Sequence, residues 1–277
     1  ITDLSLQVYT GQIFGILGPN GSGKTTTLSI AMGILQQDKG EFFWFGEKAD
    51  HHSRKQIGSL IEVPHFFPYL SLIQNLSLIA DIKGFGKNDM ERVLNEVKLF
   101  NRRNSKFRTL SLGMKQRLGI AATLLGNPAV LVLDEPTNGL DPEGIAEVRE
   151  LITEQAGKGK TIIMASHILS EVEKVCSHVA ILKSGRLIEQ GEVRTIIGGE
   201  VIIELTATNF KALTQVLDSC DFLEWKKINQ DNVLVSLKDG KNAEDLNRFI
   251  FLKGVTLSGI ITHKKTLESQ FLELVKG

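Results

Sequence analysis

The sequence predicts an α/β fold, with a parallel sheet covered by helices on both faces, followed by a small α+β domain. As far as Gly198, apolar runs that suit strands alternate with helical segments, and this alternation predicts parallel strands joined by helices. The run Val130–Leu133 is continuously apolar, as expected of a strand buried on both faces. Around Gly198-Gly199 the composition shifts. We therefore expect one domain over residues 1–198 and an accessory domain over residues 199–277.

Composition limits the classes of partner and compartment. The 277 residues include 32 Lys+Arg and 32 Asp+Glu, so there is no overall positive field to attract nucleic acid, and we expect no nucleic-acid partner. No apolar run is long enough to cross a bilayer. The two cysteines, Cys176 and Cys220, are too few and too distant for a disulfide framework. We expect a cytoplasmic location.

The first elements follow from short apolar runs. Strands are predicted at Leu4–Tyr9, Ile13–Leu17, Glu41–Phe45 and Ile57–Ile61, and a helix over Thr26–Met32. The aromatic strand Glu41–Phe45 is expected to fill the core. The chain begins with Ile and not Met, so we expect the natural protein to begin earlier.

The middle of the chain is helical. Between Ser71 and Asn127, apolar residues recur at helical spacing, for example at Leu72, Leu76 and Ile79, which predicts a helical subdomain over residues of about 70–127. The alternating pattern then resumes. We expect a helix from Pro142, a strand at Thr161–Ala165, a helix at Leu169–Val175 and a strand at Val179–Leu182.

The C-terminal part has a different order of elements, which resembles a ferredoxin-like fold. The predicted elements are the strand Val201–Leu205, the helix Phe210–Leu217, the strands Phe222–Lys226 and Val233–Leu237, the helix Ala243–Phe251, the strand Val255–Ile261 and the helix Leu267–Val275. No motif with recognisable chemistry lies in this part.

A complete phosphate-binding loop follows the strand Ile13–Leu17. It reads Gly18-Pro19-Asn20-Gly21-Ser22-Gly23-Lys24-Thr25 and leads into a helix, which is the context that this motif requires. Its glycines allow backbone N–H groups to surround phosphate oxygens, and the helix start adds a positive dipole end. Lys24 supplies charge to the β- and γ-phosphates, and the Thr25 hydroxyl is a ligand for Mg²⁺. The sequence therefore predicts a nucleoside triphosphate site.

An acidic pair provides the second nucleotide signal. Asp134-Glu135 follows the apolar strand Val130–Leu133. A carboxylate at this end of a strand beside a phosphate loop suits Mg²⁺ binding, which we assign to Asp134. Glu135 is then placed to polarise an attacking water as a general base.

A possible helix start lies between these two motifs. Leu110-Ser111-Leu112-Gly113-Met114 precedes an apolar-periodic segment, and Ser111 suits a helix N-cap. Local chemistry alone leaves two interpretations open, a capped helix and a phosphate-binding helix start.

The ordered set of motifs resembles the ATP-binding-cassette (ABC) ATPases. The set comprises the phosphate loop, Leu-Ser-x-Gly, the apolar strand with Asp-Glu-Pro-Thr-Asn-Gly-Leu-Asp, and Ser166-His167. The resemblance covers roughly Ile1 to Gly198. It implies a P-loop NTPase fold with a RecA-like core and a helical subdomain, using ATP and Mg²⁺. A guanine-reading Asn-Lys-x-Asp motif is absent from the sequence, which argues against a GTPase.

The resemblance also implies the remaining roles. Cassettes of this family work as head-to-tail pairs, so Ser111 and the Gly113 backbone would bind the γ-phosphate of the ATP held by a partner. His167 would contact the γ-phosphate and hold the attacking water, and Asp141 would lie in the segment that crosses the dimer interface. Thr26, at the start of the helix, joins the ATP-binding positions of the phosphate loop.

Three features depart from the commonest family pattern. Leu112 and Met114 stand where glycine and glutamine are usual. Glu62 occupies a position that is usually glutamine and that reaches Mg²⁺ and water. These variants are similar to ATPase subunits of bacitracin- and lantibiotic-type self-protection exporters. The aromatic residue that stacks on adenine in the family would lie upstream of residue 1, since Tyr9 is too close to the phosphate loop.

A proline- and aromatic-rich segment follows Glu62. Pro64-His65-Phe66-Phe67-Pro68-Tyr69 suits a stiff loop with a partner-binding surface, although the aromatics also suit the core. In the family this region helps to form the groove that receives a helix of the membrane permease.

The resemblance implies an ATP-hydrolysing subunit of an ABC exporter, working as a homodimer or with a related cassette. It would lie at the cytoplasmic face of the membrane and drive a separate permease. An importer ATPase is one alternative, and a soluble ABC protein without a transport role is another.

Overall fold

The computed structural model describes residues 1–62, 65–198, 201–229, 231–237 and 241–276. It separates into two compact units, Ile1–Val193 and Arg194–Gly277. The boundary expected after Gly198 differs from this division by the short helix α8 (Val193–Ile197).

The first unit is built on a six-stranded sheet in the order β4-β5-β6-β1-β7-β8. All neighbouring strands are parallel except β7 and β8, which form an antiparallel edge. β5 is buried along its whole length, as its continuous apolar run predicts. The strands are β1 (Ile13–Leu17), β4 (Ile57–Leu60), β5 (Val130–Asp134), β6 (Thr161–Ser166), β7 (His178–Lys183) and β8 (Arg186–Glu192).

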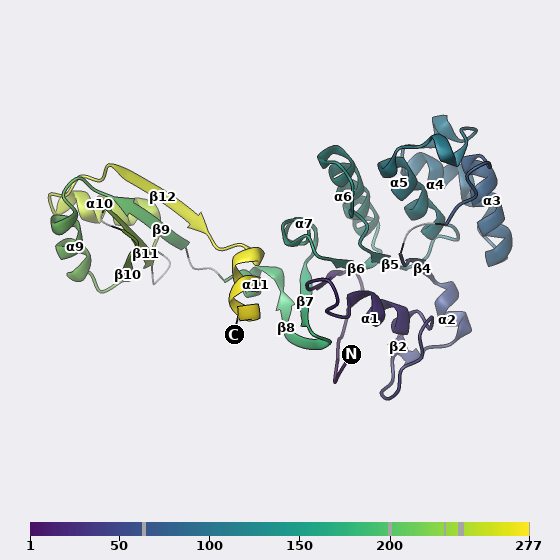
Figure 1. Cartoon of the computed structure of the whole chain (residues 1–277), viewed down its shortest axis with the longest axis horizontal. Coiled ribbons are helices and arrows are strands. Elements are labelled where there is room, and N and C mark those ends of the chain that lie inside the picture. The colour runs from purple at the N-terminus through teal and green to yellow at the C-terminus, as the bar shows by residue number, and fades with distance from the viewer. Residues whose placement is uncertain (63–64, 199–200, 230, 238–240, 277) are drawn as a thin grey trace. The chain divides into compact units, whose positions relative to one another are not determined.

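Helices cover both faces of this sheet. On β1, Phe14 and Ile16 share a core cluster with Leu28 of helix α1 (Lys24–Ala31). Gly15 faces the other side, where a Cβ would press against Val172 of helix α7 (Leu169–Val175). Figure 1 shows α1 on one face and α7, with α6 (Pro142–Gly157), on the other.

The helical subdomain contains three α-helices, α3 (Leu72–Lys83), α4 (Met90–Glu96) and α5 (Leu112–Thr123). Ser71 caps α3 through a capping box with Gln74. Leu72 and Leu76 are completely buried, so the predicted apolar face of α3 is correct. Three 3-10 turns complete the block, at Lys87–Asp89, Phe100–Arg102 and Phe107–Thr109.

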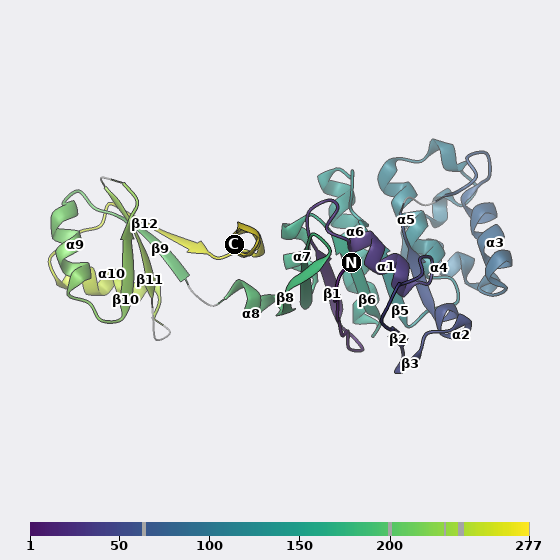
Figure 2. The same ribbon diagram turned by 60° about the horizontal axis from the view of Figure 1, so that its bottom comes forward.

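The second unit is a four-stranded antiparallel sheet in the order β10-β11-β9-β12. Because β11 is antiparallel to both neighbours, β9 and β10 run in the same direction on either side of it, which is the split βαβ plan. Helices α9 and α10 cover one face around a shared core (Figure 2). The elements are β9 (Val201–Thr206), α9 (Phe210–Asp218), β10 (Leu223–Lys227), β11 (Asn232–Leu237), α10 (Ala243–Leu252), β12 (Gly259–Lys264) and α11 (Leu267–Lys276).

Several predicted elements are wrong or incomplete. Leu4–Tyr9 forms no strand, because its apolar residues pack on the core cluster without strand pairing. The predicted aromatic strand shrinks to β2 (Phe43–Trp44), paired with β3 (Glu47–Lys48). Of its aromatics, Trp44 packs on the core, whereas the Phe43 and Phe45 side chains are exposed.

Other short elements escaped prediction. The edge strand β8 is largely exposed and carries charged residues, so it lacks the apolar run that marks buried strands. A short helix, α2 (His51–Lys55), is capped by Asp50, whose side chain accepts a hydrogen bond from the Ser53 N–H. The last strand of the second unit begins at Gly259 and not at Val255.

Candidate nucleotide site

The predicted nucleotide motifs meet at one edge of the sheet. Leu17 at the end of β1 pairs with Ser166 at the end of β6, and Asp134 at the end of β5 pairs with Ala165. Parallel strands place their carboxyl ends at a common edge, where ligands bind in open α/β sheets. The phosphate loop, Asp134-Glu135 and Ser166-His167 therefore start from neighbouring points.

The phosphate loop depends on glycine at two positions. Gly18 has φ +158°, and a Cβ there would collide with the Ser22 hydroxyl and the Leu182 carbonyl. Gly23 is the N-cap of α1 in the left-handed region, with φ +104°. Ser22 is buried, and its hydroxyl has no partner among the described residues. Asn20, Gly21 and Thr26 are exposed, so this side of the loop faces solvent.

Lys24 lies inside the loop and not on its surface. Its side chain is only 6% exposed, and its Nζ donates to the Gly18 carbonyl at 2.9 Å and to the Pro19 carbonyl at 3.4 Å. The same Nζ lies 3.4 Å from Glu135 Oε1. The charged amine is thus held beside the loop backbone by carbonyls and one carboxylate.

Glu135 joins Lys24 to His167. Its second oxygen, Oε2, lies 2.7 Å from Nδ1 of His167 and accepts the His167 backbone N–H at 3.3 Å. Glu135 has φ +47°, an uncommon backbone conformation for this residue type, and its N–H donates to the Ala165 carbonyl. A carboxylate bound in this way beside a phosphate loop has the chemistry to accept a proton from water.

Asp134 and Thr25 form a set of oxygen ligands that fits Mg²⁺. The Thr25 side chain is near enough to Asp134 to lower the pKa of its carboxyl, while Asp134 Oδ1 is buried with no partner among the described residues. Burial raises the pKa of Asp134, and the charges of Glu135 and Glu62 raise it further against the opposing effects of Thr25 and Lys24. A hard divalent cation prefers such oxygens and would satisfy the unpaired one. Glu62 follows β4 and has φ +63°.

Ser111, Gly113 and Asp141 form a second group. Ser111 caps α5 and accepts the Met114 N–H, and Asp141 caps α6 and accepts the Gly144 N–H at 2.9 Å. The two helix starts are close, since a Cβ on Gly113 would lie 3.7 Å from the Gly144 Cα. No hydrogen bond or ion pair joins this group to the phosphate loop within the described ranges.

The aromatic segment is partly exposed. Phe67 and Tyr69 are 45% and 63% exposed, whereas Phe66 packs against Phe107 with the rings tilted and their centroids 5.0 Å apart. Two of the aromatics are therefore exposed and one is half-buried against Phe107, and a partner-binding role of the exposed pair stays a prediction. Pro64 lies outside the described residues.

Sequence reasoning missed a residue that supports this segment. Asn75 is 1% exposed; its side chain accepts the Phe67 N–H and donates to the Phe67 and Leu70 carbonyls. The signal was a polar residue on the apolar face of the predicted helix. Thr137, two residues after Glu135, was also missed; it is 3% exposed, and its hydroxyl has no partner in the described structure.

Within the part of the chain that the structure describes, no helix combines the length and apolarity that a membrane span needs.

Comparisons with known proteins identify the family. The family model described as "ABC transporter" matches residues 1–138. The chain is 35% identical to the uncharacterized ABC transporter ATP-binding protein YhcH of Bacillus subtilis, over 99% of this chain and 90% of that protein. It is 35% identical to the bacitracin transport ATP-binding protein BcrA of Bacillus licheniformis, over 100% of this chain and 92% of that protein. It is 37% identical to the lantibiotic transport ATP-binding protein SrtF of Streptococcus pyogenes, over 69% and 84% of the two chains.

Solved structures agree with this result. CbiO1 of Clostridium perfringens, part of the ABC transporter complex cbiONQ, has a TM-score of 0.62 and 31% identity over 68% of this chain and 80% of its own. The cassette MJ0796, in a dimeric post-hydrolysis state bound to ADP and Pi, has a TM-score of 0.61 and 25% identity over 68% and 88% of the two chains. The chain belongs to the family of ABC transporter ATP-binding proteins.

Proposed function

We propose that this chain is the Mg²⁺-dependent ATPase subunit of an ABC exporter and drives a separate membrane permease from the cytoplasmic face. The observation that carries the proposal is the linked set Lys24–Glu135–His167 at the sheet edge, directly beside the phosphate loop. A lysine, a carboxylate and a histidine in contact at this place suit phosphoryl transfer to water.

Each residue has a role in this reaction. The loop from Gly18 to Thr25, with Thr26, holds the phosphates through backbone N–H groups and Lys24. Thr25, Asp134 and Glu62 would hold Mg²⁺, which neutralises charge on the phosphates when bound. Glu135 would accept the proton of the attacking water. His167 fixes the orientation of Glu135 through the 2.7 Å contact and would contact the γ-phosphate when ATP is bound.

The second group, Ser111, Gly113 and Asp141, would act on the ATP of another cassette. Their exposed helix starts leave N–H groups available for a phosphate. The dimeric state of the similar cassette MJ0796 supports a head-to-tail pair, as a homodimer or with a related cassette.

The transport direction and the partner rest on the relatives and on one surface. BcrA and SrtF are bacitracin and lantibiotic transport ATP-binding proteins, and outward movement of such peptides would protect a cell. Phe67 and Tyr69 provide an exposed aromatic surface of the kind that partners bind. We expect a permease helix to dock there and no nucleic-acid partner.

Co-purification from native membranes tests this proposal. A tagged chain should bring a multi-span permease without a substrate-binding protein, identified by mass spectrometry. Recovery of a permease together with a binding protein would indicate an importer. Recovery of soluble partners alone would contradict a transport role.

A further inference from the structure

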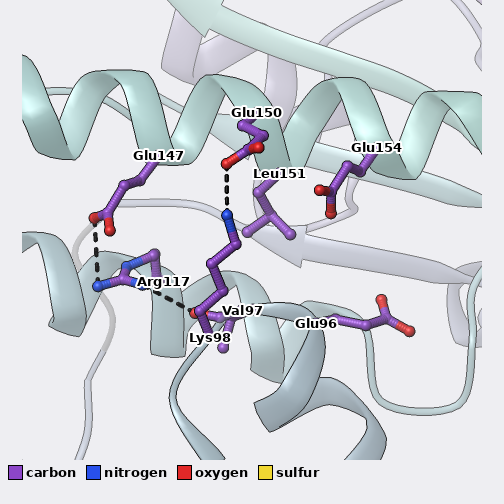
Figure 3. A pocket seen from close by; sticks show the side chains of 8 residues that line it. All are labelled: Glu96, Val97, Lys98, Arg117, Glu147, Glu150, Leu151 and Glu154. Carbon is purple, nitrogen blue, oxygen red and sulfur yellow. Dashed lines mark hydrogen bonds and ion pairs between the residues drawn. The ribbon is translucent and has the colours of Figure 1, made fainter.

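One face of α6 carries three acidic side chains at helical spacing. Glu147, Glu150 and Glu154, here called the α6 acidic face, line a shallow cleft opposite α5 and the end of α4. Figure 3 shows two cations approaching this face from the helical subdomain, Arg117 from α5 and Lys98 from the segment after α4.

Arg117 connects three segments at once. Its Nη2 lies 3.3 Å from Glu147 Oε2 on α6, and its Nη1 donates to the Val97 carbonyl at 3.1 Å. The side chain is 12% exposed, and its Nε is buried without a partner in the described structure. Leaving a buried donor unpaired costs free energy, so the two contacts of Nη1 and Nη2 are the ones that stabilise this side chain.

The position of this contact links it to the second half of the nucleotide site. Arg117 lies one helical turn after Gly113 on α5, and Glu147 lies about one turn after Gly144 on α6. Gly113 and Gly144 already approach each other at the two helix starts. The Arg117–Glu147 pair is therefore the next contact along the same two helices, and it limits how far they can rotate apart.

A neighbouring pair on the same face makes a matched comparison. Lys98 Nζ lies 2.6 Å from Glu150 Oε2, but both side chains are more than half exposed, at 57% and 56%. Exposed pairs of this kind contribute little to structure. Arg117 is much more buried and its planar fork reaches two partners, which a lysine cannot reproduce.

We infer that Arg117 is a positioning residue for catalysis, which holds Ser111 and Gly113 in register with Asp141 so that they can engage the ATP of the partner cassette. This inference rests on the proposed head-to-tail ATPase. Arg117 would touch no nucleotide itself.

The first test measures the variant Arg117→Met, which keeps an apolar stem and removes the fork. Hydrolysis should fall about tenfold, while ATP binding by its own phosphate loop should change less than about twofold, because misplacing a contacting group mainly affects the reaction step. Arg117→Lys should recover only part of the rate. Lys98→Met, the exposed control, should keep the wild-type rate.

The second test places the defect in one chain of a mixed dimer, purified through two different tags. With Lys24→Ala on one chain and Arg117→Met on the other, one phosphate loop still faces an intact Ser111–Gly113 segment. With both substitutions on the same chain and a wild-type partner, no intact phosphate loop faces an intact Ser111–Gly113 segment. The first arrangement should hydrolyse ATP several-fold faster than the second, which general loss of folding cannot produce.

Ser111→Arg in place of Arg117→Met separates the two proposals. If the hydrolysis rate differs between the two arrangements with Ser111→Arg but not with Arg117→Met, Arg117 has no positioning role. If the two arrangements give the same hydrolysis rate with both variants, the proposed head-to-tail ATPase is wrong. Wild-type hydrolysis by Arg117→Met would also overturn the inference.

Discussion

The two halves of the candidate nucleotide site differ in burial and in internal pairing. On the sheet side, Lys24 and Asp134 are 6% and 5% exposed, and Lys24 is already bound to Glu135. On the helical side, Ser111 is exposed and bonds only to the first turn of its own helix among the described contacts.

This difference has a physical meaning. The buried amine of Lys24 is paired within the chain, so this part of the sheet side forms as part of folding. Exposed helix starts can remain without a protein partner because water satisfies their N–H groups. A site with one half fixed by folding and the other half open to solvent suits completion by a second chain.

Glu135→Gln is expected to have the largest effect on the sheet side. Loss of the general base should lower turnover about a hundredfold or more. ATP binding should persist, because Lys24 and the loop backbone are retained. Steady-state hydrolysis and nucleotide binding check this, with Glu189→Gln, an exposed carboxylate on β8, as the control. Turnover at the wild-type rate would rule out Glu135 as the base.

Ser111→Arg tests the exposed half. A long cation at the cap should block approach of a second chain and lower hydrolysis by about a hundredfold, with ATP binding to the same chain unchanged. The cap variant Ser111→Ala should cost only about 1 kcal/mol of helix stability. Full activity of Ser111→Arg would show that the two halves do not act together.

Asp134→Asn examines the metal-binding part of the buried half. Replacing this carboxylate by an amide should raise the Mg²⁺ concentration for half-maximal hydrolysis about tenfold, since neutral oxygen is a weaker ligand. Chelation of Mg²⁺ should abolish hydrolysis in both proteins. A Mg²⁺ titration identical to wild type would exclude Asp134 as a ligand.

The double variant Phe67→Ser, Tyr69→Ser tests whether the permease binds to the exposed aromatic side chains beside the helical subdomain. Recovery of the permease from membranes should fall about tenfold, because buried aromatics dominate interfaces. Hydrolysis by the isolated chain should stay within about twofold of wild type. Ile188→Ser, at another exposed apolar residue, should leave recovery unchanged.

Lys83 provides a pH-dependent test of the stability of the helical subdomain, which carries Ser111 and Gly113. Burial lowers the pKa of Lys83 to about 8, and its Nζ donates to the Ala122 carbonyl of α5. In the unfolded chain Lys83 has the ordinary lysine pKa of about 10.4. Between about pH 8 and about pH 10 the unfolded chain therefore binds more protons than the folded chain, and the free energy of unfolding rises with pH over this range. Below pH 8 the cost of burying the charge is fully present.

Denaturant unfolding of wild type and Lys83→Met at pH 7 and pH 10 isolates this effect. Between pH 7 and pH 10 the free energy of unfolding should rise less in Lys83→Met than in wild type, by up to about 3 kcal/mol. Parallel pH dependence of the two proteins would show that Lys83 keeps an ordinary pKa in the fold.

Much of the sheet side was predictable because its signals are local. The apolar run of β5 predicted a buried strand and placed Asp134 at its end, and helix α7 has the predicted bounds Leu169–Val175. The glycine pattern between Gly18 and Gly23 predicted the phosphate-binding loop. The structure leaves no room for a side chain at Gly18.

The rest depends on contacts between segments that are distant in sequence. Nothing near Arg117 indicates that Glu147 faces it, and nothing near Asn75 indicates that its amide holds the Phe67 loop. The apolar residues in Leu4–Tyr9 predicted a strand, but they pack on the core cluster and the segment has no strand to pair with.

The mass of Glu135→Gln in solution, measured with and without Mg²⁺ and ATP, tests the two-chain site most directly. Since this variant binds ATP without consuming it, we expect dimers with Mg²⁺-ATP and monomers without nucleotide. Adding Ser111→Arg should return the sample to monomers. If Glu135→Gln stays monomeric when ATP occupies its phosphate loop, the site is not shared between two copies of this chain.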